Sequence, residues 1–134
     1  MSVEITRGFP SSITEEMIHD LVHGFYARVR ADAALGPIFD RAIKDWDVHL
    51  AKMCDFWSSV MLTSGLYKGN PMLAHLRLKS VTPAHFERWL ALFRTTAHEL
   101  FAPDIARSFI GRAENIAKSL QLGMFFRADA KPAS

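Results

Sequence analysis

Large apolar residues recur at helical spacing along most of this chain. Positions 18–29 repeat every three or four residues and predict a helix that ends near Arg30. Ser12 and Glu15 have the spacing of a capping box, which predicts that this helix starts after Ser12 as its N-cap. Gly24 lies inside the pattern and indicates a place where another helix passes close.

The next segment changes direction before a second helix. Pro37 can begin a helical turn but cannot continue one, so residues 33–39 predict a short corner. The central helix then begins at Asp45 or Asp47 and runs to about residue 64, with Gly65 as its stop. Its two apolar stripes contain His49, Met53, Phe56 and Val60, and Trp46, Leu50, Met53, Trp57 and Met61. Together the stripes make a face wide enough to be buried.

Helical signals continue through the second half of the chain. Residues 71–76 predict a helix of barely two turns. Thr82 followed by Pro83 is an N-cap with a proline at the first helical position, and the helix after it ends near residue 101. Pro103 begins the last helix, which continues through Leu120. Strand periodicity is absent from the sequence, so the predicted class is all-α.

The composition limits the class of protein. The chain has 134 residues, of which 49% are hydrophobic and 22% are charged, as expected for one globular domain spanning residues 1–134. Within it we expect residues 1–11 to form an irregular arm and residues 127–134 to form a polar tail. The net charge of +2 is small and the basic residues are scattered, which argues against nucleic acid as a partner.

The single cysteine and the lengths of the apolar runs limit the cellular location of the protein. Cys54 is the only cysteine, which excludes an internal disulfide and a cysteine-based metal cluster. No apolar run in the sequence is long enough to cross a membrane, and residues 1–7 lack the apolar segment of a signal peptide. We therefore expect a cytoplasmic protein with no membrane partner, in which Cys54 is a buried structural thiol.

Three hydrogen-bonding side chains, Tyr26, His49 and Trp89, lie on three different predicted helices among large apolar neighbours. Taken singly, each is typical of a packed core, where buried aromatic rings are common and a lone histidine is usually structural. Taken together, they suggest a ligand-binding site, because phenol and indole are hydrogen-bond donors and imidazole can donate or accept. Three such groups converging on one apolar cavity would suit a small, partly negative ligand.

A second histidine, His75, lies on the short segment that follows Pro71. His49 and His75 flank an apolar run, and two such histidines can face each other across a flat ligand such as an iron porphyrin, which imidazole nitrogen binds. The remaining histidines have simpler interpretations. We expect His85 to be a capping or surface residue and His98 to be exposed. We expect His19 and His23 to be a solvated pair rather than a metal-binding site.

Several short motifs follow one another in a recognisable order. They are Phe25-Tyr26 with Val29-Arg30, Leu35-Gly36-Pro37-Ile38-Phe39, Asp45-Trp46, His49-Leu50, Met53, Asp55-Phe56-Trp57-Ser58-Ser59, Gly65, Tyr67, Gly69, Pro71, His75-Leu76, His85-Phe86, Arg88-Trp89-Leu90 and Leu92-Phe93. In order and spacing they resemble group III truncated haemoglobins over roughly residues 13–125. The double-glycine motifs typical of the other truncated groups are absent from the sequence, which also favours group III.

The resemblance implies a two-over-two helical sandwich around one haem b. His75 corresponds to the proximal ligand of the iron. Tyr26, His49 and Trp89 correspond to the distal residues that face the bound ligand. Phe39 corresponds to the phenylalanine that packs on the porphyrin.

Further residues are expected to line the cofactor slot or to pair with the haem propionates. Lys52 and Arg77 are candidates for the propionates, with a solvated charge as the alternative for each. The residues expected along the walls are Phe25, Met53, Phe56, Trp57, Tyr67, Met72, Leu76, Phe86, Phe93 and Ile116.

The implied function is reversible binding of oxygen, nitric oxide and carbon monoxide, with oxidation of nitric oxide by bound oxygen as a further activity. A second interpretation is peroxidase-like redox catalysis with His49 as the acid–base group. A third is a helical interaction module that binds no cofactor. The sequence contains no reductase domain, so any redox cycle needs an external electron donor or reductase.

Overall fold

The structure is a computed structural model that describes residues 13–67, 69 and 81–126. Every regular element within these residues is helical, as the sequence predicts. In chain order the elements are α2 Glu15–Ala31, α3 Leu35–Ala42, α4 Trp46–Leu62, α6 Pro83–Leu100, α7 Pro103–Gln121 and the π-helix η2 Leu122–Phe126. The expected arm at 1–11, the short helix at 71–76 and the tail at 127–134 lie outside the described residues.

α2 begins later than the capping-box spacing predicts. Its N-cap is Thr14, whose hydroxyl oxygen accepts a hydrogen bond from the Met17 backbone N–H at 3.2 Å, so the prediction of Ser12 as the cap is wrong. This start places Ile13 just before the cap and Ile18 in the fourth helical position, and both side chains are buried in the core. Apolar residues at these two positions commonly fix the start of a helix, which explains the choice of Thr14.

The corner predicted at residues 33–39 is instead an eight-residue helix, α3. The Asp32 carboxylate accepts hydrogen bonds from the backbone N–H groups of Ala34 at 3.0 Å and Leu35 at 2.9 Å. These bonds satisfy donors that the start of a helix leaves without intrahelical partners. Pro37 lies in the first turn, where a missing N–H costs nothing, so the proline does not end the helix.

Two glycines mark close approaches of the backbone. A Cβ atom at Gly36 would lie 2.6 Å from the Arg30 carbonyl oxygen, so the turn from α2 into α3 requires glycine at that position. Gly24 faces α6, where its added Cβ would lie 3.4 Å from Thr96 Cγ2 and 3.9 Å from Leu100 Cδ1. The prediction that another helix passes close to Gly24 is confirmed.

α4 begins at the predicted cap and ends slightly early. Asp45 is the N-cap, and its carboxylate accepts a hydrogen bond from the Val48 backbone N–H at 3.2 Å. The helix ends at Leu62 because Thr63 takes a left-handed conformation with φ of 52°. Gly65, the predicted stop, lies beyond this point.

The last two long helices start as predicted. Thr82 is the N-cap of α6 and Pro83 occupies its first turn, while Pro103 opens α7. α7 then continues into η2, a π-helix that the apolar periodicity does not predict.

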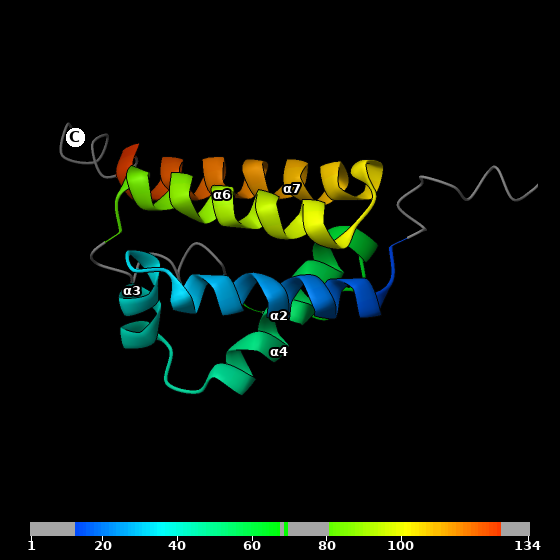
Figure 1. Cartoon of the computed structure of the whole chain (residues 1–134), viewed down its shortest axis with the longest axis horizontal. Helices are drawn as coiled ribbons and strands as arrows, with labels where there is room; N and C mark the ends of the chain where they lie inside the picture. The colour runs from blue at the N-terminus through cyan, green and yellow to red at the C-terminus, as the bar shows by residue number, and fades with distance from the viewer. Residues whose placement is uncertain (1–12, 68, 70–80, 127–134) are drawn as a thin grey trace, which may run out of the picture.

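Two pairs of helices form the layers of the fold (Figure 1). α2 packs against α4, α6 packs against α7, and α2 also contacts α6, so the two layers meet along α2 and α6. α3 lies across one end of α2 and reaches α6. This is the predicted two-over-two sandwich. None of the described helices is long and apolar enough to span a membrane.

Candidate functional site

Tyr26 and His49 are in direct contact between α2 and α4. Their ring centroids lie 5.0 Å apart with the planes at 90°, which is the edge-to-face arrangement that aromatic rings favour. Trp46, in the first turn of α4, lies 5.5 Å from the His49 ring and 6.0 Å from the Tyr26 ring. Phe39 of α3 lies 6.0 Å from Tyr26 on another side. The structure therefore brings two of the three predicted distal residues together.

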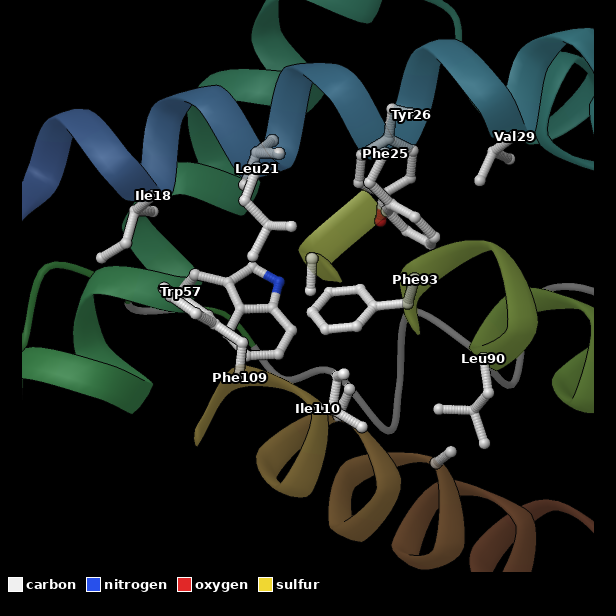
Figure 2. Close-up of a cluster of buried hydrophobic side chains, with 14 of the residues drawn as sticks. Ile18, Leu21, Phe25, Tyr26, Val29, Trp57, Leu90, Phe93, Phe109 and Ile110 are labelled. Carbon is white, nitrogen blue, oxygen red and sulfur yellow. The ribbon is translucent and has the colours of Figure 1, made fainter. Parts of the chain in front are cut away.

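Tyr26 is a buried phenol that stays neutral. The residue is 6% exposed, and burial raises the pKa of its hydroxyl well above the ordinary value of tyrosine. Figure 2 shows its ring beside Phe25 above the core aromatics. Within the described part of the chain, no hydrogen bond engages the Tyr26 hydroxyl. The group is thus available as a donor to a ligand.

An apolar pocket lies between α3, α6 and α7. It has about 400 Å³ of empty space, part of which is open to solvent. Its lining residues are Leu35, Ile38, Phe39, Val81, His85, Phe86, Trp89 and Leu120. A mainly apolar lining with few polar groups is typical of sites for small molecules and cofactors.

Trp89, the third predicted distal residue, lines this pocket from α6. Its ring contacts Phe25 edge-to-face at 5.3 Å and stacks on Phe93 at 5.8 Å. Phe25 in turn lies 4.9 Å from Tyr26, and Phe39 contacts Tyr26 while lining the pocket. Trp89, Tyr26 and His49 therefore belong to one continuous aromatic group that borders the pocket.

The apolar face of α4 is divided in the structure. Trp57 and Met61 are buried, and Trp57 stacks on Phe93 at 5.2 Å with Phe109 on another side (Figure 2). The neighbouring stripe of His49, Met53, Phe56 and Val60 is only half-buried. An apolar helix face that the chain does not fully cover fits a flat apolar cofactor, as does the apolar pocket. These residues therefore suit the haem that the sequence motifs imply.

The remaining predicted wall residues differ in burial. Tyr67 is half-buried and contacts Phe56 edge-to-face at 5.2 Å, and burial raises the pKa of its hydroxyl. Ile116 is half-buried on α7, while Lys52 is exposed on α4. Four predicted residues lie outside the described part of the chain, namely Met72, His75, Leu76 and Arg77.

His85 combines a capping position with a place in the pocket. Its Nδ1 accepts a hydrogen bond from the Thr82 backbone N–H at 3.0 Å, which confirms the prediction of a capping residue. The same side chain lines the pocket, which its sequence position does not reveal. His19, His23 and His98 are exposed as expected, and the rings of His19 and His23 are stacked at 4.0 Å.

Cys54 is half-buried, so the expectation of a buried thiol is only partly met. Burial, followed by the nearby carboxylates of Asp55 and Glu15, raises the pKa of this thiol. A protonated thiol is a poor nucleophile, which leaves the structural interpretation in place. Among the residues that the structure describes, no cluster of three or more histidine, cysteine or acidic side chains is placed to hold a metal ion.

Trp46 is a site residue that periodicity places only in an apolar stripe. Its indole N–H donates a hydrogen bond to Asp40 Oδ1 at 3.2 Å, and the guanidinium carbon of Arg30 lies 4.4 Å from the centre of its ring. The spacing of three residues between Trp46 and His49 puts both on one face of α4. That spacing was the available signal, but it does not reveal that α2 and α3 bring Arg30 and Asp40 against the indole.

Comparison with known proteins agrees with this geometry. The bacterial-like globin family matches residues 13–121. The chain is 36% identical over 114 residues to the group 3 truncated hemoglobin ctb of Campylobacter jejuni, a match that covers 82% of this chain and 90% of that protein. The crystal structure of the group III truncated hemoglobin from Campylobacter jejuni has a TM-score of 0.80 and covers 84% of this chain and 92% of its own. The chain therefore belongs to the bacterial-like globin family and is a group III truncated haemoglobin, a haem protein that binds diatomic gases.

Proposed function

We propose that this globin binds oxygen and other diatomic ligands reversibly, with Tyr26 and Trp89 as hydrogen-bond donors and His75 as the proximal ligand. The observation that carries the proposal is the buried phenol of Tyr26, which no described residue engages and which lies against His49. A buried side chain that keeps an unused donor lowers stability, and a bound ligand offsets this cost by accepting the bond.

The proposed cofactor is haem b, which would supply an iron that binds diatomic ligands. His75 would hold that iron through a neutral ring nitrogen, and a hydrogen bond from its second ring N–H would fix the orientation of the ring. Phe39, Phe86 and Leu35 give the pocket an apolar lining. Surroundings of low polarity strengthen each polar contact made inside.

The two donors act on charge in the ligand. Burial keeps the pKa of Tyr26 far above neutral pH, so its hydroxyl remains a donor under all physiological conditions. The indole N–H of Trp89 can only donate, and its side chain lines the pocket. A hydrogen bond to a charged acceptor contributes about 1.5–3 kcal/mol. Tyr26 and Trp89 therefore retain a partly negative ligand such as oxygen better than uncharged carbon monoxide.

The remaining expected residues complete the proposed cofactor slot. Lys52 and Arg77 pair with the haem carboxylates, and the exposure of Lys52 on α4 supports a position at the solvent edge of the slot. The other walls are proposed to come from Met53, Phe56, Tyr67, Met72, Leu76 and Ile116. Phe25, Trp57 and Phe93, which were also expected there, are buried in the hydrophobic core.

His49 is proposed to control access of ligands to the site. Its ring is half-buried, with Tyr26 on one side and Trp46 on another. A half-buried side chain at the edge of a cavity can turn between the cavity and solvent, and such motions often set binding rates.

Peroxidase-like turnover is a second candidate, because Nε2 of His49 is buried beside Tyr26. A buried imidazole in that position can carry a proton to or from a bound peroxide. This activity, like oxidation of nitric oxide, requires electrons from an external donor or reductase. Steady consumption of peroxide with a reducing substrate would favour it, whereas slow bleaching of the haem would favour simple ligand binding.

The first experiment is the visible absorption spectrum of the oxidised, reduced and carbon monoxide-bound protein, together with His75→Ala and His98→Ala. We expect a haem spectrum that responds to carbon monoxide, is lost or grossly altered in His75→Ala, and is unchanged in His98→Ala, because His98 is exposed on α6. An unaltered spectrum in His75→Ala would reject His75 as the proximal ligand. A colourless protein made with ample haem would indicate a helical interaction module without a cofactor.

A further inference from the structure

We propose that Trp46 is a positioning residue that holds His49 in its inward orientation and thereby sets the rate of ligand association. The inference rests on the proposed role of His49 in ligand access. It adds Trp46, whose contacts with Asp40 and Arg30 the sequence spacing does not reveal.

The His49 ring contacts two aromatic rings, whose own centroids lie 6.0 Å apart. Tyr26 contacts it at 5.0 Å and 90°, and Trp46 contacts it at 5.5 Å and 86°. Both contacts are edge-to-face, the orientation in which the positive edge of one ring meets the negative face of another. Turning His49 toward solvent breaks both contacts, so the two rings favour the inward orientation.

Trp46 is itself fixed by groups from two other helices. Its indole N–H donates to the Asp40 carboxylate of α3 at 3.2 Å. The Arg30 guanidinium of α2 lies 4.4 Å from the ring centre, within the range of a cation–π interaction. Since Trp46 stands on α4, three helices determine the place of one indole, and that indole determines the room available to His49.

The exposed contacts of Trp46 and the buried donor on Tyr26 are expected to affect different rates, namely ligand association and ligand dissociation. Asp40 and Arg30 are exposed, whereas Tyr26 is buried. Substitutions of Asp40 or Trp46 change the orientation of His49 without removing the donor on Tyr26. We infer that these outer contacts control how fast a ligand arrives, while the buried donors control how fast it leaves.

The test is carbon monoxide association after flash photolysis of the full chain, in Trp46→Phe, Asp40→Asn and the control Asp47→Asn. Asp47 is exposed in the same first turn of α4 and has no hydrogen bond or ion pair with the other described residues. We expect association to accelerate roughly three- to tenfold in Trp46→Phe and about threefold in Asp40→Asn, as partly exposed aromatic and charge contacts predict. The control and the oxygen dissociation rate should stay within about a factor of two.

A double-mutant cycle distinguishes positioning from a general loosening of the fold. If Trp46 acts through His49, Trp46→Phe has no further effect on association in a His49→Ala background. Equal acceleration by Trp46→Phe in both backgrounds would overturn the proposal. So would an unchanged association rate in protein that binds carbon monoxide normally, whereas a protein that binds no carbon monoxide would instead reject the proposed function.

A spectroscopic measurement checks the anchor independently of ligand kinetics. In the ferrous carbon monoxide form of the ¹⁵N-labelled full chain, the Trp46 indole N–H should resonate downfield and exchange slowly, because a carboxylate accepts its hydrogen. Asp40→Asn should shift that resonance upfield and speed its exchange, with the Trp57 and Trp89 indole signals unmoved. An indole signal of Trp46 that Asp40→Asn leaves unchanged would remove the anchor and with it the proposal.

Discussion

Removal of the Tyr26 hydroxyl should accelerate oxygen dissociation while leaving association nearly unchanged. Tyr26→Phe deletes one oxygen atom from a side chain that is 6% exposed, and it preserves the ring contacts with Phe25, Phe39 and His49. The access route therefore keeps its shape. What is lost is a single donor to a ligand that carries partial negative charge.

The expected magnitude follows from the strength of that one bond. A hydrogen bond to a charged acceptor contributes about 1.5–3 kcal/mol, and each ~1.4 kcal/mol changes a rate by a factor of ten. Oxygen dissociation should therefore accelerate roughly 10- to 100-fold, and carbon monoxide dissociation much less. The free energy of unfolding should change by less than about 1 kcal/mol in either direction, since the hydroxyl has no partner among the described residues.

The assay is stopped-flow displacement of oxygen by excess carbon monoxide, with urea unfolding in parallel. Thr96→Val serves as the control, because it removes a different buried hydroxyl, one that donates to the Leu92 carbonyl at 2.8 Å on α6. The control should lose stability without a comparable change in oxygen dissociation. An oxygen dissociation rate in Tyr26→Phe within twofold of the parent would refute the assignment of Tyr26 as a donor.

The same substitution carries a pH signature in stability. Burial raises the pKa of Tyr26, whereas an unfolded tyrosine ionises near pH ~10. Above that pH the unfolded chain releases a proton that the folded chain retains, so stability falls as pH rises. The parent should lose up to about 1.4 kcal/mol per pH unit relative to Tyr26→Phe in this range. Parallel stability curves above pH ~10 would indicate that the phenol is not buried.

Two further predictions concern the frame around the site. Gly36→Ala should lower the free energy of unfolding by about 1–3 kcal/mol in urea titrations, because its Cβ would lie 2.6 Å from a carbonyl oxygen, whereas Gly111→Ala, with nothing within 4 Å, should raise it by about 0.5–1 kcal/mol. Burial works to raise the pKa of Asp32, but the backbone N–H of Leu35, the Arg88 Nε–H that donates to both carboxylate oxygens, and the backbone N–H of Ala34 together hold it below its ordinary value. Arg88→Gln should therefore cost about 1 kcal/mol at pH 7, and this difference should shrink as pH falls through ~4, where the unfolded carboxylate binds its proton. A difference that is constant from pH 7 to pH 3 would contradict the pairing.

Capping residues and prolines predicted the start of a helix correctly where the sequence offered only one candidate start. Thr82 and Pro83 define the start of α6 without competition, and Pro103 does the same for α7. At α2, Ser12 and Thr14 both offer a capping hydroxyl, and tertiary burial of Ile13 decides between them. A capping pattern in the sequence contains no information about tertiary burial, so the prediction of the N-cap of α2 failed.

The site was predictable in its members but not in its contacts. Tyr26, His49 and Trp89 each stand among apolar residues, and family motifs assign them to one ligand. The contact of Tyr26 with His49 depends on how α2 crosses α4, and the contact of Tyr26 with Phe39 depends on the turn into α3. Crossing geometry arises from packing over whole helices, which periodicity along one helix does not contain.

The division of the α4 face shows where a sequence pattern and a folded structure diverge for a physical reason. Periodicity predicts one wide apolar face, yet Trp57 and Met61 are buried while Met53 and Phe56 stay half-buried. A helix in a cofactor-free core gains most by burying its whole apolar face against protein. An apolar stripe that remains partly uncovered, next to a buried phenol without a described partner, is better explained by a cofactor that completes the core. We propose that the large apolar residues of α4 have two partners: Trp57 packs against Phe93, and the half-buried stripe would pack against the haem.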